Sequence, residues 1–180
     1  MPSCAVARPA SCPCCGAAGR PIGARVSIVG HGLVRRQVRG ALEFGGAPGQ
    51  VELVLRRYRC RACSAVLIVG PRGLQRRRWY GAGAIARAFA AYARGATTPQ
   101  VRAATSPAVH TGTSSVERWI TLIRWLDAAE RGELLGVAGL RGLYRRSVAE
   151  HVTLALAARA GRVLGDDLAR CAFVGASLAA

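Results

Sequence analysis

The sequence contains no lysine and few carboxylates. All 26 basic side chains are arginine, only nine residues are aspartate or glutamate, and the formal net charge is +17. A surface with this imbalance attracts polyanions, so it favours nucleic acid, and DNA in particular, as the partner. A GC-rich genome would also replace lysine by arginine, but that bias leaves the scarcity of acids unexplained.

Long hydrophobic runs are missing as well. Residues 1–21 hold early cysteines and prolines and lack the apolar core of a secretory signal. The longest apolar stretch near the end, residues 171–180, is too short to cross a bilayer. We therefore expect no membrane span, and a cytoplasmic, nucleoid-associated protein.

Seven cysteines occur in this setting, and without an export signal they indicate metal ligands or reactive thiols rather than a disulfide framework. Four of them form two C-x-x-C units: Cys12 with Cys15, and Cys60 with Cys63. A two-residue spacer lets one tight turn present two sulfur atoms, and two such knuckles satisfy tetrahedral zinc. A redox dithiol is the alternative interpretation. A four-cysteine site has no open position for a substrate, so the pattern predicts structural Zn²⁺ and no catalytic residue.

Cys14 offers a competing sulfur atom in the first knuckle. We prefer Cys15 as the ligand because Gly16 follows it and frees the turn, and because Pro13 fits inside the spacer. Cys14 is then a spare thiol. Two further cysteines lie too far from either knuckle to be assigned: Cys4 and Cys171.

The first third of the chain is rich in glycine and in β-formers. Short strands are predicted at residues 25–29, 33–44, 50–58 and 65–69. The glycine-rich segment 45–49 is a turn signal. We therefore expect an N-terminal zinc ribbon of short antiparallel strands over residues 1–71, followed by a basic linker, residues 72–80.

Beyond Pro71 the composition changes to alanine, leucine and arginine, with apolar residues at helical spacing. Helices are predicted at residues 82–94, 99–105, 115–130, 147–160 and 166–178. Ser114, Ser115 and Glu117 match a capping box, which predicts a helix beginning at Ser115. The expected fold class is α+β, a four-cysteine zinc ribbon followed by a helix-turn-helix-like domain over residues 81–180.

The predicted helix 115–130 has one apolar and one polar side. Its apolar side holds Val116, Trp119, Ile120, Ile123 and Leu126. Its polar side holds Arg118, Thr121 and Arg124. The second helix of a helix-turn-helix offers such residues to base edges, and arginine pairs well with guanine. An ordinary solvated face is the alternative, and the loop 106–114 is longer than the usual turn.

Further candidate DNA contacts surround the second knuckle and fill the linker. They are Arg57, Arg59, Arg61, Arg76, Arg77 and Arg78. The linker arginines form a phosphate clamp if DNA binds there. Trp79 and Tyr80, which follow them, can instead wedge into the module boundary.

These features together resemble the N-terminal region of bacterial insertion-sequence transposases and of related bacterial zinc-ribbon proteins. The resemblance is carried by the CPCCG knuckle at 12–16, the RYRCRAC segment at 57–63 and the SVERW segment at 115–119, and it covers residues 12–126. In that family the ribbon and a helix-turn-helix bind DNA, and a ribonuclease-H-like domain cuts it with three carboxylates. Ser64 departs from the family's usual glycine after the last cysteine.

The carboxylates after Leu126 do not fit the family's catalytic domain, because residues 127–180 are predicted to be helical and offer no strands that converge on two metals. We therefore expect a non-catalytic DNA-binding protein without a small-molecule substrate, either a regulator or a transposase remnant. The alternative is a zinc-ribbon module that docks a larger protein. The apolar stripes of the C-terminal helices serve either core packing or a homodimer; they include Val148, Val152, Leu156, Leu164 and Leu168.

Overall fold

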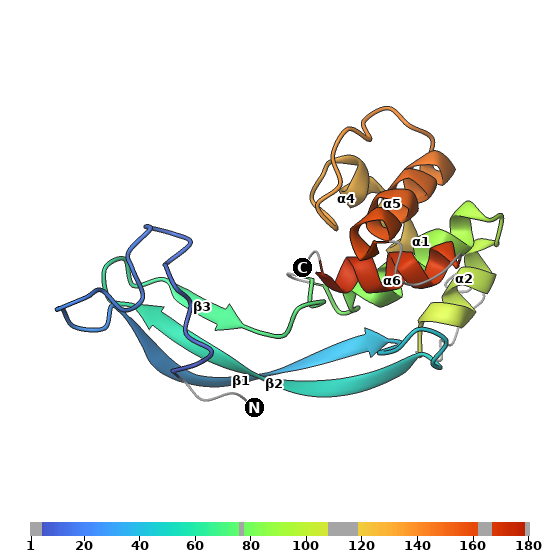
Figure 1. Cartoon of the computed structure of the whole chain (residues 1–180). Helices are drawn as coiled ribbons and strands as arrows, with labels where there is room; N and C mark the ends of the chain where they lie inside the picture. Colours follow the sequence, from blue (N-terminus) through green and yellow to red (C-terminus); the bar gives the residue numbers. More distant parts are fainter. Residues whose placement is uncertain (1–4, 76–77, 108–118, 162–166, 179–180) are drawn as a thin grey trace. The chain divides into compact units, whose positions relative to one another are not determined.

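The computed structural model describes residues 5–75, 78–107, 119–161 and 167–178 (Figure 1). Within these residues the fold is α+β, with one three-stranded antiparallel sheet and five helices. The chain divides into two compact units. The cysteine unit comprises Met1–Gln37 and Glu52–Pro71, and the helical unit comprises Val38–Val51 and Arg72–Ala180. The end of the first hairpin thus belongs with the helices, whereas we had placed all of residues 1–71 in one domain.

Three strands form the sheet in the order β1-β2-β3. They are β1 (Ile28–Gly40), β2 (Gly49–Cys60) and β3 (Val66–Val69). The prediction of two separate strands at 25–29 and 33–44 is wrong, since one strand of 13 residues runs from the end of the first segment through most of the second. β1 is continuous through Gly30 and Gly32 and is hydrogen-bonded to its neighbour β2.

The cysteine unit has a small core. Cys12, Ile28, Tyr58 and Cys60 are buried in it. In β2 the side chains alternate between the two faces of the sheet, so Tyr58 points into this core while Arg57 and Arg59 lie on the other face.

The helical unit contains α1 (Ala82–Ala93), α2 (Thr98–Thr105), α4 (Ile120–Glu130), α5 (Arg145–Ala160) and α6 (Leu168–Leu178). The predicted helices at 82–94, 99–105, 147–160 and 166–178 are confirmed, with ends that differ by at most two residues. Helices α1, α5 and α6 pack on one another, α2 packs on α1, and α4 packs on α5. Among the described residues, no helix is long and apolar enough to cross a membrane.

Two glycines allow the helices of this unit to approach closely. A Cβ atom on Gly175 of α6 would collide with the carbonyl oxygen of Leu156 in α5. A Cβ atom on Gly83 of α1 would meet the ring of Phe173. Val148, Val152 and Leu156 are buried in the same core, which confirms core packing for these three residues of the predicted stripes. Leu168 is exposed, and Leu164 lies outside the described residues.

The predicted start of the 115–130 helix, Ser115 with its capping box, lies outside the described residues. Within them α4 covers Ile120–Glu130, and Trp119, its N-cap, has a non-helical ψ of 82°. Trp119 is 5% exposed and packs edge-to-face on Tyr80 and Trp125. This aromatic contact fixes Trp119 in the core and leaves Ile120 exposed, although we had placed Ile120 on the buried side.

The helix-turn-helix remains a prediction. Its two helices would be α2 and α4, and each packs mainly on a different neighbour. Residues 108–118, which would form most of the turn, lie outside the described residues.

Candidate metal centre

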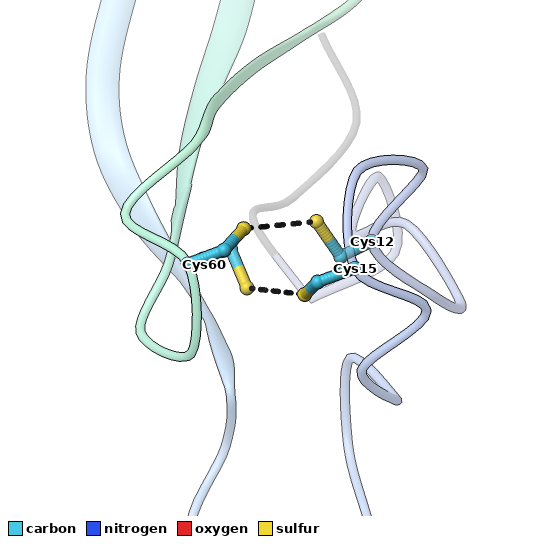
Figure 2. A group of neighbouring side chains, drawn as sticks. Cys12, Cys15 and Cys60 are labelled. Atoms are coloured by element: carbon cyan, nitrogen blue, oxygen red, sulfur yellow. Dashed lines mark hydrogen bonds between the residues drawn. The ribbon is translucent and has the colours of Figure 1, made fainter.

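The two C-x-x-C units bring four sulfur atoms together. The Sγ atoms of Cys12, Cys15, Cys60 and Cys63 all lie within 4.8 Å of one another. The Cys12 and Cys63 sulfur atoms are 3.7 Å apart, and so are those of Cys15 and Cys60. Figure 2 marks these sulfur contacts with dashed lines and labels Cys12, Cys15 and Cys60. The structure thus selects Cys15, and not Cys14, as the second sulfur of the first knuckle.

These distances fit a metal and not a disulfide. A tetrahedral centre with metal–sulfur bonds of about 2.3 Å has sulfur atoms about 3.8 Å apart, whereas a disulfide bond is about 2.05 Å long. All four cysteines are free thiols. The first cysteine of each pair, Cys12 or Cys60, is buried, and the second is exposed. A closed four-sulfur cage of this kind suits one metal ion of structural type.

The two knuckles repeat one backbone design. The amide of Cys12 donates to the carbonyl oxygen of Ala17 at 2.9 Å, and the amide of Cys60 donates to that of Ala65 at 2.9 Å. The flanking residues pair alike, since Ser11 bridges to Ala18 and Arg59 pairs with Val66. The repeat is visible in the sequence, where the six-residue pattern C-x-x-C-small-Ala occurs at 12–17 and 60–65.

The residue after each knuckle takes the left-handed conformation. Gly16 has a φ of 73° and Ser64 a φ of 62°. Ser64 therefore adopts the conformation that glycine adopts at lower cost, and its hydroxyl oxygen accepts a hydrogen bond from the Arg59 guanidinium at 3.5 Å. With serine in place of glycine, the second turn thus keeps the same left-handed conformation as the first.

Backbone amides point at the sulfur atoms. Hydrogen bonds from the Cys14 and Cys15 amides outweigh the effect of burial and lower the pKa of Cys12 to about 7. The Ala65 amide likewise lowers the pKa of Cys63. The neighbouring sulfur atoms, that of Cys15 first, and burial outweigh this effect and raise the pKa of Cys63 to about 12. Cys14 thus contributes its amide to the first knuckle, while its own side chain is exposed.

Of the two unassigned cysteines, the described residues include only Cys171, which is not part of the cluster. Cys171 is buried on α6 in the helical unit. Cys4 lies outside the described residues.

The arginines predicted to contact DNA fall into separate groups. Arg59 and Arg61 are exposed and Arg57 is half-buried; Arg57 lies opposite Ile68 and Arg59 opposite Val66 in β3. We call Arg57, Arg59 and Arg61 the knuckle arginines.

In the helical unit, Arg124 is exposed and Thr121 is half-buried on α4. Arg78 is half-buried and, after Arg131, helps to lower the pKa of Glu133. Three further candidates lie outside the described residues: Arg76, Arg77 and Arg118.

Positive charge is concentrated in the cysteine unit. The segments that form it contain nine arginines and a single carboxylate, Glu52. Glu52 forms an ion pair with Arg35 at 3.0 Å, with both side chains exposed. The knuckle arginines therefore stand in a local excess of positive charge that the total of +17 does not reveal.

Comparison of the chain with protein-family models, with curated proteins and with solved structures finds no match. The resemblance to transposase N-terminal regions stays a prediction.

Proposed function

We propose that the chain is a non-catalytic DNA-binding protein, transposase-like in its ribbon, in which Cys12, Cys15, Cys60 and Cys63 hold one structural Zn²⁺. The observation that carries this proposal is the cysteine unit's excess of nine arginines over one carboxylate. Such an excess of one sign of charge is the electrostatic footprint of a protein that binds phosphates.

The zinc assignment is supported by the chemistry of the donors. Four sulfur ligands suit Zn²⁺ and leave no open coordination position, so the ion would stabilise the fold and not activate water. Free energies of binding at such sites are on the order of 10–16 kcal/mol in zinc-finger peptides, and they contribute directly to folding. The small core around Tyr58 is consistent with a unit that needs this contribution.

The sheet places two of the knuckle arginines, the half-buried Arg57 and the exposed Arg59, on one face. Their β3 partners, Val66 and Ile68, are also exposed, so the face combines guanidinium groups with apolar side chains. Arg61 continues it into the second knuckle, where its amide donates to the Ser27 carbonyl oxygen at 2.8 Å. Guanidinium groups bind phosphate oxygens with two parallel hydrogen bonds, which suits this face to a DNA backbone.

The proposal that the protein is non-catalytic is supported by four carboxylates of the helical unit, each of which is engaged by an arginine or by a backbone amide. Asp127 pairs with Arg145, and Glu133 pairs with Arg131. Glu130 accepts a hydrogen bond from the Gly142 amide. Asp167 accepts two from the first turn of α6, as a helix cap does.

Duplex binding measured by fluorescence anisotropy over a range of salt concentrations tests the proposal. The zinc-loaded protein should bind at low salt, and each phosphate contact should add roughly −0.9 to the slope of log K against log salt. The triple variant R57Q/R59Q/R61Q should reduce that slope by up to about 2.7, because three contacts are lost.

A matched control removes the same charge elsewhere. The exposed arginines Arg94, Arg141 and Arg170 belong to the helical unit, so R94Q/R141Q/R170Q has the same net charge as the first triple variant. The R94Q/R141Q/R170Q variant should bind duplex DNA more tightly than R57Q/R59Q/R61Q. If both triple variants lost the same affinity for duplex DNA, the knuckle arginines would not be the interface. If the wild type did not bind duplex DNA at low salt, the proposed function would be contradicted.

A second candidate function is docking to a larger protein. Val66 and Ile68 are 48% and 57% exposed on β3, which is an edge strand of the sheet. Exposed edge strands accept a further strand from a partner. This candidate would be favoured if the chain bound a protein with an affinity independent of salt and did not bind duplex DNA.

A further inference from the structure

Trp79 differs from the other two tryptophans in its exposure. It is 57% exposed, whereas Trp119 and Trp125 are 5% and 3% exposed in the core of the helical unit. It directly follows the run of arginines at 76–78. Its neighbour Tyr80 does wedge into a core, as we considered for both aromatics, but Trp79 does not.

The backbone fixes the direction of Trp79. The Arg39 amide donates to the Trp79 carbonyl oxygen at 2.7 Å, and the Gly81 amide donates to that of Arg39 at 3.2 Å. The segment therefore lies along β1 as a short parallel bridge. Neighbouring side chains of an extended segment point to opposite sides, so a buried Tyr80 directs Trp79 outward.

Tyr80 is itself held firmly. Its hydroxyl donates to the Ser106 hydroxyl oxygen at 2.8 Å in the core, and its ring packs on Trp125 with 4.9 Å between centroids. The orientation of Trp79 is thus set by the folded helical unit, before any partner binds. A preset aromatic ring loses little conformational entropy when a ligand stacks on it.

Arg39 covers one face of the Trp79 ring. The guanidinium carbon lies 5.0 Å from the ring centroid, and the Arg39 Nε atom donates to the Gln50 side-chain oxygen at 3.1 Å. The cation–π contact holds the ring and places a positive charge beside it. Trp79 remains 57% exposed with this contact in place, so it still offers surface to a ligand. Arg72, exposed in the same linker, adds a further cation.

We propose that Trp79, supported by Arg39, is a stacking platform for one unpaired base of a DNA strand. The inference rests on the proposed DNA binding and deepens it by assigning a preference for unpaired bases. Bases within a duplex have both faces covered by their neighbours, whereas an unpaired base offers a free face. Tryptophan stacks on any base, and nearby arginines neutralise the phosphates of the strand.

The test compares a labelled short oligothymidylate with a blunt duplex of the same length, in anisotropy titrations of W79A, W79F and Y144A. Base stacking on an aromatic side chain contributes about 1–3 kcal/mol, so W79A should weaken oligothymidylate binding by about tenfold and duplex binding by less than about twofold. W79F should retain most of the affinity. Y144A removes an aromatic side chain of the same unit that is 88% exposed and, like Trp79, is adjacent to arginines in the sequence. It should change the affinity for neither DNA.

Tryptophan emission gives a second measurement that does not depend on the stability of W79A. Oligothymidylate should quench the wild-type emission, because Trp79 is the exposed tryptophan, and should not quench W79F, in which only the buried pair remains. Equal losses in W79A on both DNAs, no loss on either, or equal quenching in W79F would overturn the platform while leaving DNA binding in place. A wild type that binds neither DNA would overturn the proposed function as well.

Discussion

Ser64 occupies in the second knuckle the position that Gly16 occupies in the first, and both residues have a positive φ, 62° and 73° respectively. The two turns therefore share one backbone conformation, although only one of them has the residue that adopts it without steric cost. This difference gives a pair of opposite predictions on one structural feature.

Ser64→Gly should stabilise the zinc-loaded protein and Gly16→Ser should destabilise it, each by about 1 kcal/mol, because a non-glycine residue in the left-handed region costs about 1–2 kcal/mol. A Cβ atom at Gly16 would meet nothing within 4 Å, so this backbone cost is the main effect there. Denaturant unfolding at saturating zinc measures both changes. A Gly16→Ser variant as stable as the wild type would contradict the equivalence of the knuckles.

Cys15→Ser should abolish binding of one equivalent of zinc, and Cys14→Ser should preserve it. The Cys15 sulfur belongs to the four-sulfur cluster, whereas Cys14 contributes its backbone amide, which serine retains. Native mass spectrometry of the two variants counts the bound metal. If Cys14→Ser lost the zinc while Cys15→Ser kept it, the assignment of the first knuckle would be reversed.

Chelation should unfold the cysteine unit and spare the helical unit. The core of the cysteine unit is small and includes two of the sulfur ligands, while the helical unit has a large core of its own. A strong chelator should make residues 5–37 and 52–71 sensitive to protease and leave the circular dichroism of the helices largely unchanged. Proteolytic resistance that is the same with and without chelator would count against a structural metal.

Gly175→Ala should destabilise the helical unit by roughly 2–4 kcal/mol, because the added methyl group collides with the Leu156 carbonyl oxygen and forces α5 and α6 apart. Gly49→Ala is the control, since a Cβ atom there would meet nothing within 4 Å and no positive φ opposes it. Unfolding followed by the emission of Trp119 and Trp125 reports on this unit. Equal stability of the two variants would show that the helices tolerate a wider spacing.

The parts of the fold that were predictable from the sequence depend on local chemistry. The spacing of Cys12, Cys15, Cys60 and Cys63 reflects the reach of a sulfur atom from a tight turn, and it identified the cluster. Apolar residues at helical spacing located α1, α2, α5 and α6, although α1 is buried on nearly all sides over Ala82–Ala90.

What was missed depends on contacts distant in sequence. Trp119 carries a local helix signal, but its packing on Tyr80, remote along the chain, fixes it outside the helix. Gly30 and Gly32 look like strand breakers, and only pairing with β2 makes β1 continuous. The exposure of Trp79 likewise follows from the burial of Tyr80 and the Arg39 backbone contact, neither of which a local pattern encodes.

The segment Val38–Val51 lies in the middle of the first 71 residues and yet belongs to the helical unit. Gly40 touches Ala84 so closely that a Cβ atom would not fit, and the carbonyl oxygen of Gly46 accepts a hydrogen bond from Arg87. No single cut in the chain therefore yields both units whole. In evolution, an exchange of the helical unit between genes would need crossovers at all three junctions between the two units, so the two units are expected to be inherited together even if their functions diverge.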